Sequence, residues 1–372
     1  RRNMWIGAAL TGVFATIEIG VNHPQITYYF LFILIAFWVN ELVLSIRKRI
    51  LPHFAKATGL LALAAVLAVG SNAGMLYYID SHSSETMRGG SELTSADGKK
   101  QDGLGLQYAT AWSYGKAETF NMLIPNLYGG TSQGGFSQDG EVAGVLKNYR
   151  ADVSQVPAYW GPQPMTSGPV YLGAVALLLA VLGMFVLRGR SKWWVFVVTL
   201  LAVLLSWGSN FMGFTELFFN YFPMYNKFRT VSMILVIAEW SVPFLMAVVL
   251  QRLWCGELDR QRLMKGLRSA VLTVGGIALL FLVFGGALMS FSGQGEDQLP
   301  QEVASAMRSE RASMMRADAF RSLLFVLLAA GVVWAFAAEK IKKTAFVLLL
   351  GVLVTADMVP VNLRYLNGDA FV

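Results

Sequence analysis

Two short polar stretches, each set between apolar runs, carry side chains suited to binding an anionic ligand. The first is "NHPQ", residues 22–25, and the second contains Lys227 and Arg229 just ahead of a long apolar run. Histidine exchanges protons near neutral pH or donates to a phosphate oxygen, and arginine holds phosphate oxygens through two parallel contacts. We therefore predict that His23 and Gln25 contact a polar headgroup and that Lys227 and Arg229 contact a phosphate.

A plainer interpretation of both stretches stays open. A proline at a turn ends one helix and starts the next, so "NHPQ" is also typical of a tight hairpin in which Asn22 caps a helix and His23 and Gln25 face water. Lys227 and Arg229 would then bind ordinary phospholipid.

Three acidic residues are further candidates. Glu18 and Glu239 lie inside apolar runs, where a charge costs about 2.5–3.5 kcal/mol on membrane-insertion scales. Each therefore predicts a polar partner inside the bundle or near its rim, with a structural or a functional role. In "GKAETF", Glu118 or Lys116 is predicted to face the ligand if the segment forms a lid over the site. The alternative is a helix that only shields the bundle.

The composition is that of a membrane protein. Of 372 residues, 55% are hydrophobic and only 14% are charged, and the single cysteine, Cys255, excludes an internal disulfide. A bilayer core of roughly 30 Å needs about 20 apolar residues per helical span. That length predicts nine spans, at residues 4–21, 27–45, 57–79, 168–187, 193–208, 231–250, 269–291, 320–338 and 344–359. The expected fold class is an all-α polytopic membrane protein.

The basic residues predict how these spans are oriented. Seventeen of the 30 lysines and arginines lie before the first span or in every second connection. Because cytoplasmic loops are enriched in Lys and Arg, the amino terminus is predicted in the cytoplasm and the carboxyl terminus outside it. The positive charges are scattered over separate loops, which argues against nucleic acid as a partner.

This orientation places most of the polar sequence on the outer side. The predicted domains are three spans in 1–79, an external loop over 80–167, four spans in 168–291 with an external segment at 209–230, an external loop over 292–319, two spans in 320–359 and the start of an external region at 360–372. An interfacial helix is expected in the large loop, because Tyr108, Trp112, Phe120 and Leu123 recur at helical spacing before Pro125. The asymmetry indicates chemistry at the outer surface.

Six blocks in this order resemble the YfhO-type bacterial membrane proteins, over nearly the whole chain. They are "NHPQITYYF", "ETMRGGSELT", "ATAWSYGKAETFNMLIPNLYGG", "YWGPQP", "FPMYNKFRT" and "DMVPVNLRYLNGDAFV". That family is similar to the C-type glycosyltransferases, which transfer a sugar from a polyprenyl-phosphate carrier outside the cytoplasmic membrane. The resemblance implies that fold, a lipid-linked sugar donor, a cell-envelope glycan acceptor and the bacterial inner membrane as location.

The resemblance also implies a catalytic acid in an external loop upstream of this chain, so no catalytic residue is assigned within it. The expected reaction is inverting transfer, with that acid as general base and cationic groups stabilising the departing lipid phosphate. Some related enzymes use a divalent cation as cofactor, but no closely spaced external Asp, Glu and His residues predict a metal site here. The resemblance further implies that residues 360–372 begin a soluble external domain.

Two functions of other classes stay open. A lipid or polysaccharide flippase or transporter would use Glu18 and Glu239 along a polar pathway that reaches the cytoplasmic side. A non-catalytic scaffold subunit would instead present an apolar external patch to a partner protein.

Overall fold

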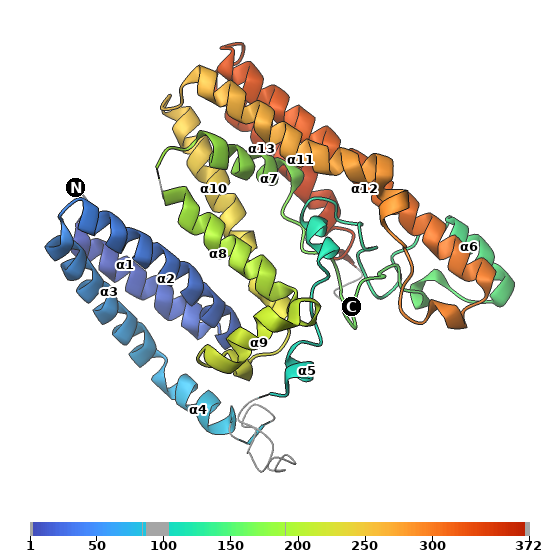
Figure 1. Ribbon diagram of the computed structural model, residues 1–372, viewed down its shortest axis with the longest axis horizontal. Helices are drawn as coiled ribbons and strands as arrows, with labels where there is room; N and C mark the ends of the chain where they lie inside the picture. The colour runs from blue at the N-terminus through green and yellow to red at the C-terminus, as the bar shows by residue number, and fades with distance from the viewer. Residues whose placement is uncertain (1–2, 84, 87–103, 190, 369–372) are drawn as a thin grey trace. The chain divides into compact units, whose positions relative to one another are not determined.

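The chain folds into helices joined by turns, as Figure 1 shows. The computed structural model describes residues 3–83, 85–86, 104–189 and 191–368, and no β-strand occurs among them. Within these ranges six helices are long and apolar enough to cross a membrane. A seventh is added if residues 192–206 and 208–221, which bend by 108°, form one broken span. The prediction of an all-α polytopic membrane protein is confirmed at this level.

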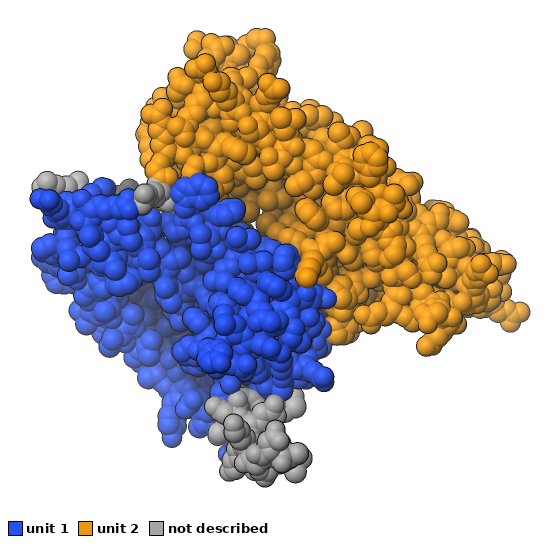
Figure 2. Space-filling view, in the orientation of Figure 1, with its two compact units in different colours: residues 1–113, 193–237 blue, residues 114–192, 238–372 orange. Residues whose placement is uncertain are grey.

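The chain divides into two compact units, which Figure 2 colours separately. Unit 1 comprises residues 1–113 and 193–237, and unit 2 comprises residues 114–192 and 238–372. The helices of unit 1 are α1 (Met4–Gly20), α2 (Pro24–Arg47), α3 (Leu51–Ser71), α4 (Ala73–Ser83), α5 (Leu106–Ala109), most of α8 (Ser191–Ser206), η5 (Gly208–Phe211), α9 (Met212–Tyr221), η6 (Tyr225–Lys227) and η7 (Val231–Leu235). Those of unit 2 are η2 (Ala117–Met122), α6 (Glu141–Leu146), η3 (Lys147–Tyr149), η4 (Val153–Gln155), α7 (Ala174–Val186), most of α10 (Val236–Trp254), α11 (Arg260–Leu288), η8 (Glu296–Gln298), α12 (Gln301–Ala337) and α13 (Lys343–Asn362).

In unit 1, α1, α2 and α3 lie side by side (Figure 1). The backbones of α1 and α3 approach closely at Gly12, where an added Cβ would lie 3.5 Å from Cβ of Ala64. Close approach through small residues is how helices pack where lipid surrounds them. Asn72 follows the end of α3, and its amide donates to the carbonyl oxygens of Thr16 (3.1 Å) and Ala68 (2.9 Å). This contact joins the ends of the two helices.

In unit 2, α12 is longer than a membrane is thick. Its 37 residues span roughly 55 Å at 1.5 Å per residue, against a bilayer core of roughly 30 Å. The polar first half packs against α6 (Figure 1). Their contact forms an apolar core of Phe136, Val142, Ala143, Leu146, Val153, Ala158, Val303, Ala306 and Met307. Glu310 caps this region by accepting the main-chain N–H groups of Ser137 (3.0 Å) and Val142 (2.9 Å).

Several helix boundaries differ from the predicted ones. The third predicted span, 57–79, is interrupted at Asn72, between α3 and α4. The fourth was expected from residue 168, but α7 begins at Ala174, after Gly173 with φ 89°. A Cβ at Gly173 would meet the sulfur of Met358 at 2.7 Å, so both the backbone and the packing require glycine there. The longest helix, α12, begins at Gln301, well before the predicted start of the eighth span at residue 320.

The single interfacial helix expected over residues 108–123 is wrong. The structure has the four-residue α5 and the separate 3₁₀-helix η2, with non-helical backbone at Ser113–Gly115 between them. Residues 87–103 of the same predicted loop lie outside the described residues, as does most of the "ETMRGGSELT" block.

Candidate anion pocket

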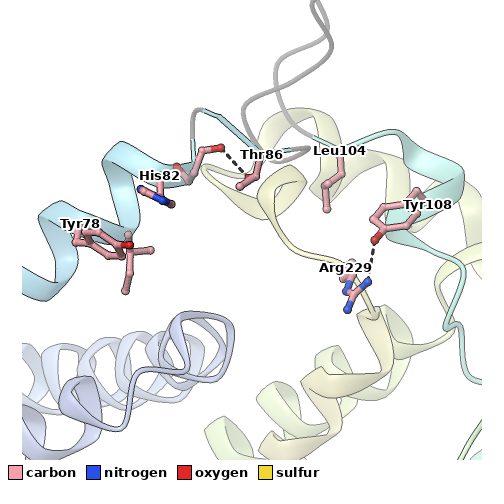
Figure 3. A pocket seen from close by; sticks show the side chains of 8 residues that line it. Tyr78, His82, Thr86, Leu104, Tyr108 and Arg229 are labelled. Atoms are coloured by element: carbon pink, nitrogen blue, oxygen red, sulfur yellow. Dashed lines mark hydrogen bonds between the residues drawn. The ribbon is translucent and has the colours of Figure 1, made fainter.

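Unit 1 contains an open pocket of about 450 Å³, shown in Figure 3. The end of α4 forms one wall of the pocket and contributes Tyr78 and His82. The opposite wall contains Tyr108 and Arg229. The full lining is Tyr78, Ile79, His82, Ser83, Thr86, Leu104, Tyr108 and Arg229. The pocket thus combines aromatic rings, hydroxyl groups, an imidazole and a guanidinium.

Main-chain hydrogen bonds hold the segment that carries Arg229 against the segment that carries Tyr108. The N–H of Leu104 donates to the carbonyl oxygen of Asn226 (2.9 Å), and the N–H of Thr230 donates to that of Ala109 (3.1 Å). Thr230 has φ 59°, an unfavourable conformation for a β-branched residue. Such a conformation persists only where the surroundings fix it, and functional sites are where it is most often found.

The first turns of α2 support the same segment from another side. The amide nitrogen of Gln25 donates to the carbonyl oxygen of Arg229 (2.5 Å) and to that of Thr230 (3.4 Å). The hydroxyl of Tyr28 donates to the carbonyl oxygen of Pro223 (2.7 Å). Gln25 is buried, so its predicted role as a headgroup contact is replaced by a positioning role beneath Arg229.

No carboxylate among the described residues neutralises the guanidinium of Arg229, so its positive charge can interact with a ligand. Its Nη1 donates to the hydroxyl of Tyr108 at 2.8 Å, and its Cζ lies 5.9 Å from the centre of that ring. Both contacts are with a neutral group, and Arg229 forms no ion pair with a carboxylate in the described part of the chain. A fixed, exposed guanidinium beside hydroxyl groups is suited to an oxygen-rich anion such as a phosphate.

The other predicted ligand contacts lie outside the pocket lining. Lys227 is partly buried in the same loop as Arg229. His23 is exposed and caps α2, where its Nδ1 accepts the N–H of Ile26 at 3.4 Å. The sequence had suggested Asn22 as the capping residue, and the structure gives this role to His23.

Glu118 belongs to unit 2 and is buried in a polar cluster of its own. Oε2 accepts the N–H of Gly115 (2.8 Å), and Oε1 accepts the hydroxyl of Tyr159 (2.9 Å) and the amide N–H of Gln163 (2.9 Å). Burial raises the pKa of Glu118 above its usual value, although the three hydrogen bonds act in the opposite direction. The side chain is 1% exposed, so it holds the loop together and presents no surface to a ligand.

The two acids predicted to lie inside the membrane have different surroundings. Glu18 is partly buried and accepts a hydrogen bond from the hydroxyl of Thr27 at 2.9 Å, which links α1 to α2. Glu239 lies in α10 with its side chain exposed on the surface of that helix. The contact of Glu18 favours the structural interpretation of that residue.

Buried ion pairs in unit 2 were missed by the sequence reasoning. Arg364 makes two contacts with the carboxylate of Asp318, at 2.7 and 2.8 Å, and Asp318 also accepts the N–H of Asn126 at 3.0 Å. Arg311, 1% exposed, pairs with Glu296. Asp357 accepts the hydroxyl of Tyr171, pairs with Arg321 and accepts the N–H of Val175. The partners are 15 to 46 residues apart in the chain, so no local spacing pattern reveals them.

A divalent cation has no evident site in the described residues. No group of three or more His, Cys, Asp and Glu side chains is placed there to hold a metal ion.

Comparison of the chain with family models, curated proteins and solved structures found no match.

Proposed function

We propose that this chain is a membrane glycosyltransferase-like protein that transfers a sugar from a polyprenyl-phosphate carrier to a cell-envelope glycan acceptor. The proposal includes a C-type glycosyltransferase fold with nine crossings of the bacterial cytoplasmic membrane. It places the amino terminus in the cytoplasm and the polar loops outside. Membrane lipids, the lipid-linked donor and the acceptor glycan are the proposed partners.

The observation that carries the proposal is the guanidinium of Arg229, fixed on the wall of an aromatic pocket without a carboxylate partner among the described residues. On the predicted topology, Arg229 lies on the outer side, against the tendency of basic residues to gather in cytoplasmic loops. An anionic group of the ligand supplies the missing partner. The rings of Tyr78 and Tyr108 offer flat apolar faces to a prenyl chain or a sugar.

The proposed reaction balances as a displacement at the anomeric carbon. The hydroxyl oxygen of the acceptor forms a bond to that carbon, and the bond from the same carbon to the phosphate oxygen breaks. The polyprenyl phosphate leaves with the electron pair, and the hydroxyl proton passes to a carboxylate general base. Arg229 stabilises the negative charge that grows on the departing phosphate.

Binding of the carrier tests this role. The full chain is reconstituted in phosphatidylcholine nanodiscs and titrated with radiolabelled undecaprenyl phosphate. Arg229→Gln is expected to weaken binding about tenfold, the effect of losing roughly 1.4 kcal/mol of charge-assisted hydrogen bonding.

Two controls separate charge recognition from misfolding. Arg150→Gln, at an exposed arginine that does not line the pocket, should leave the affinity unchanged. Uncharged undecaprenol should bind the wild type and Arg229→Gln equally. If Arg229→Gln binds the phosphate as tightly as the wild type does, the pocket is not the carrier site and the proposal loses its main support.

A further inference from the structure

A second cationic cavity lies in unit 2, at the end of α7 and the beginning of α11. It has a volume of about 420 Å³. Its polar lining includes Gln261, Arg262, Lys265 and Ser269. Arg262, Lys265 and Ser269 are three, four and seven residues apart, so they share one face of α11.

Close packing of α7 and α11 beside the cavity fixes its shape. Gly266 lies on the same face of α11, and a Cβ there would lie 3.4 Å from both Cδ1 of Leu182 and Cβ of Phe185 and would collide with Val186. Without a side chain at Gly266, the helices meet directly at this point. The cationic side chains of α11 therefore lie beside a tightly packed contact between α7 and α11.

Arg262 is held in place but is not saturated with partners. Its Nη2 lies 3.4 Å from the carbonyl oxygens of both Phe185 and Leu187, near the end of α7. Its Nε is buried and has no hydrogen-bond partner among the described residues. Of the five guanidinium N–H donors, the contacts above use only Nη2, so the donors on Nη1 have no partner in the described part of the chain and can meet an acceptor in the cavity.

Most of the charged side chains near Arg262 are positive. Lys265 is exposed in the lining, and Lys192 is close enough to Arg262 for their charges to repel. The one carboxylate in the lining, Asp259, accepts the main-chain N–H of Arg262 at 2.9 Å and so caps α11. Its charge is directed at the helix terminus, and the cations outnumber it.

We propose that this cavity binds a phosphate group, supplied by the headgroup of an anionic phospholipid or by free phosphate. Arg262 and Lys265 neutralise the charge, while Ser269 and Gln261 offer further hydrogen bonds. Basic cavities between helices that cross a bilayer are sites where anionic lipid headgroups bind. The site is independent of the pocket around Arg229 and of the proposed transferase activity.

The test uses the full chain in detergent and native mass spectrometry to count bound dioleoyl phosphatidylglycerol, with dioleoyl phosphatidylcholine in a parallel titration. We expect Lys265→Gln to weaken the tightest phosphatidylglycerol binding about fivefold, and the double variant Arg262→Gln, Lys265→Gln to weaken it at least tenfold. A second arm measures inorganic phosphate by isothermal titration calorimetry. A loss confined to the lipid arm identifies a headgroup site, and a loss confined to the phosphate arm identifies a soluble anion.

Arg268→Gln is the matched control, because Arg268 is exposed on the same helix and does not line the cavity. It should bind both ligands as the wild type does. If Arg262 proves necessary for folding, Lys265→Gln alone still decides the question, since its side chain is exposed. Equal binding by Lys265→Gln, Arg268→Gln and the wild type in both arms would overturn the proposal.

Discussion

The side-chain amide of Gln25 donates a hydrogen bond to the main-chain carbonyl oxygen of Arg229 at 2.5 Å. The two residues are 204 positions apart in the chain. This contact fixes the backbone of the residue whose guanidinium lines the pocket, while the side chain stays exposed. The start of α2 therefore determines where the positive charge lies.

Gln25→Ala removes this support. We expect a loss of about 1–3 kcal/mol in the free energy of unfolding, because the carbonyl oxygen of Arg229 loses its donor. Affinity for undecaprenyl phosphate in nanodiscs should fall as well, since Arg229 is no longer held in one position. Gln133→Ala, at an exposed glutamine, should change neither quantity. Unchanged carrier affinity in Gln25→Ala would show that the loop keeps its shape without α2.

The ion pair of Asp318 and Arg364 should be energetically coupled. The side chain of Asp318 is 4% exposed and that of Arg364 is 33% exposed, so solvent screens the pair only in part. We expect Arg364→Gln to cost about 2 kcal/mol, less than a fully buried pair would, because it leaves a buried carboxylate without its cation. A double-mutant cycle with Asp318→Asn, measured by unfolding in mixed micelles, should give a coupling of about 1–2 kcal/mol. Additive effects of the two substitutions would contradict the pairing.

Glu118 should make stability depend on pH. Burial raises its pKa above the usual value of 4.5, so the folded protein holds the proton more tightly than the unfolded chain does. The stability from this group is full below pH about 4.5 and is lost as pH rises through the raised pKa. Glu118→Gln does not titrate, so its melting temperature should rise relative to the wild type as pH increases from 4 to 8. A difference that stays constant or shrinks over this range would contradict a raised pKa.

Cysteine labelling tests the predicted sidedness. The native Cys255 is exposed between α10 and α11, on the predicted cytoplasmic side. A membrane-impermeant maleimide should label it only after spheroplasts are permeabilised. Gln138→Cys in a Cys255→Ser background should be labelled in intact spheroplasts, because Gln138 is exposed in the predicted outer loop. The reverse pattern would place the pocket of Arg229 in the cytoplasm and remove the basis for an extracytoplasmic transferase.

The helical fold was predictable from the sequence, because apolar runs of sufficient length have few alternatives in a bilayer. The ends of the helices were less predictable, since they depend on tertiary contacts. Asn72 ends α3 where its amide reaches Thr16, and α7 begins only after Gly173, whose φ of 89° is outside the helical region. The polar half of α12 contains no apolar run of membrane-spanning length, so the search for spans missed it, although it is helical and packs against α6.

The candidate site was predictable only in part. Arg229 was identified from its charge at a position where the orientation rule predicts few cations. Its neighbours in the pocket, Tyr78 and His82, come from a distant helix and carry no motif. Gln25 was identified for the wrong reason, because its partners are main-chain carbonyl groups, which have no sequence signature.

The continuity of α12 has a mechanical consequence. One unbroken helix supplies three of the nine buried residues of the apolar core around α6 at one end and enters the apolar bundle at the other. A continuous α-helix resists bending because its backbone is hydrogen-bonded along its whole length. A force applied at Glu310 therefore tilts the entire helix within the bilayer, since no loop interrupts the helix to absorb it.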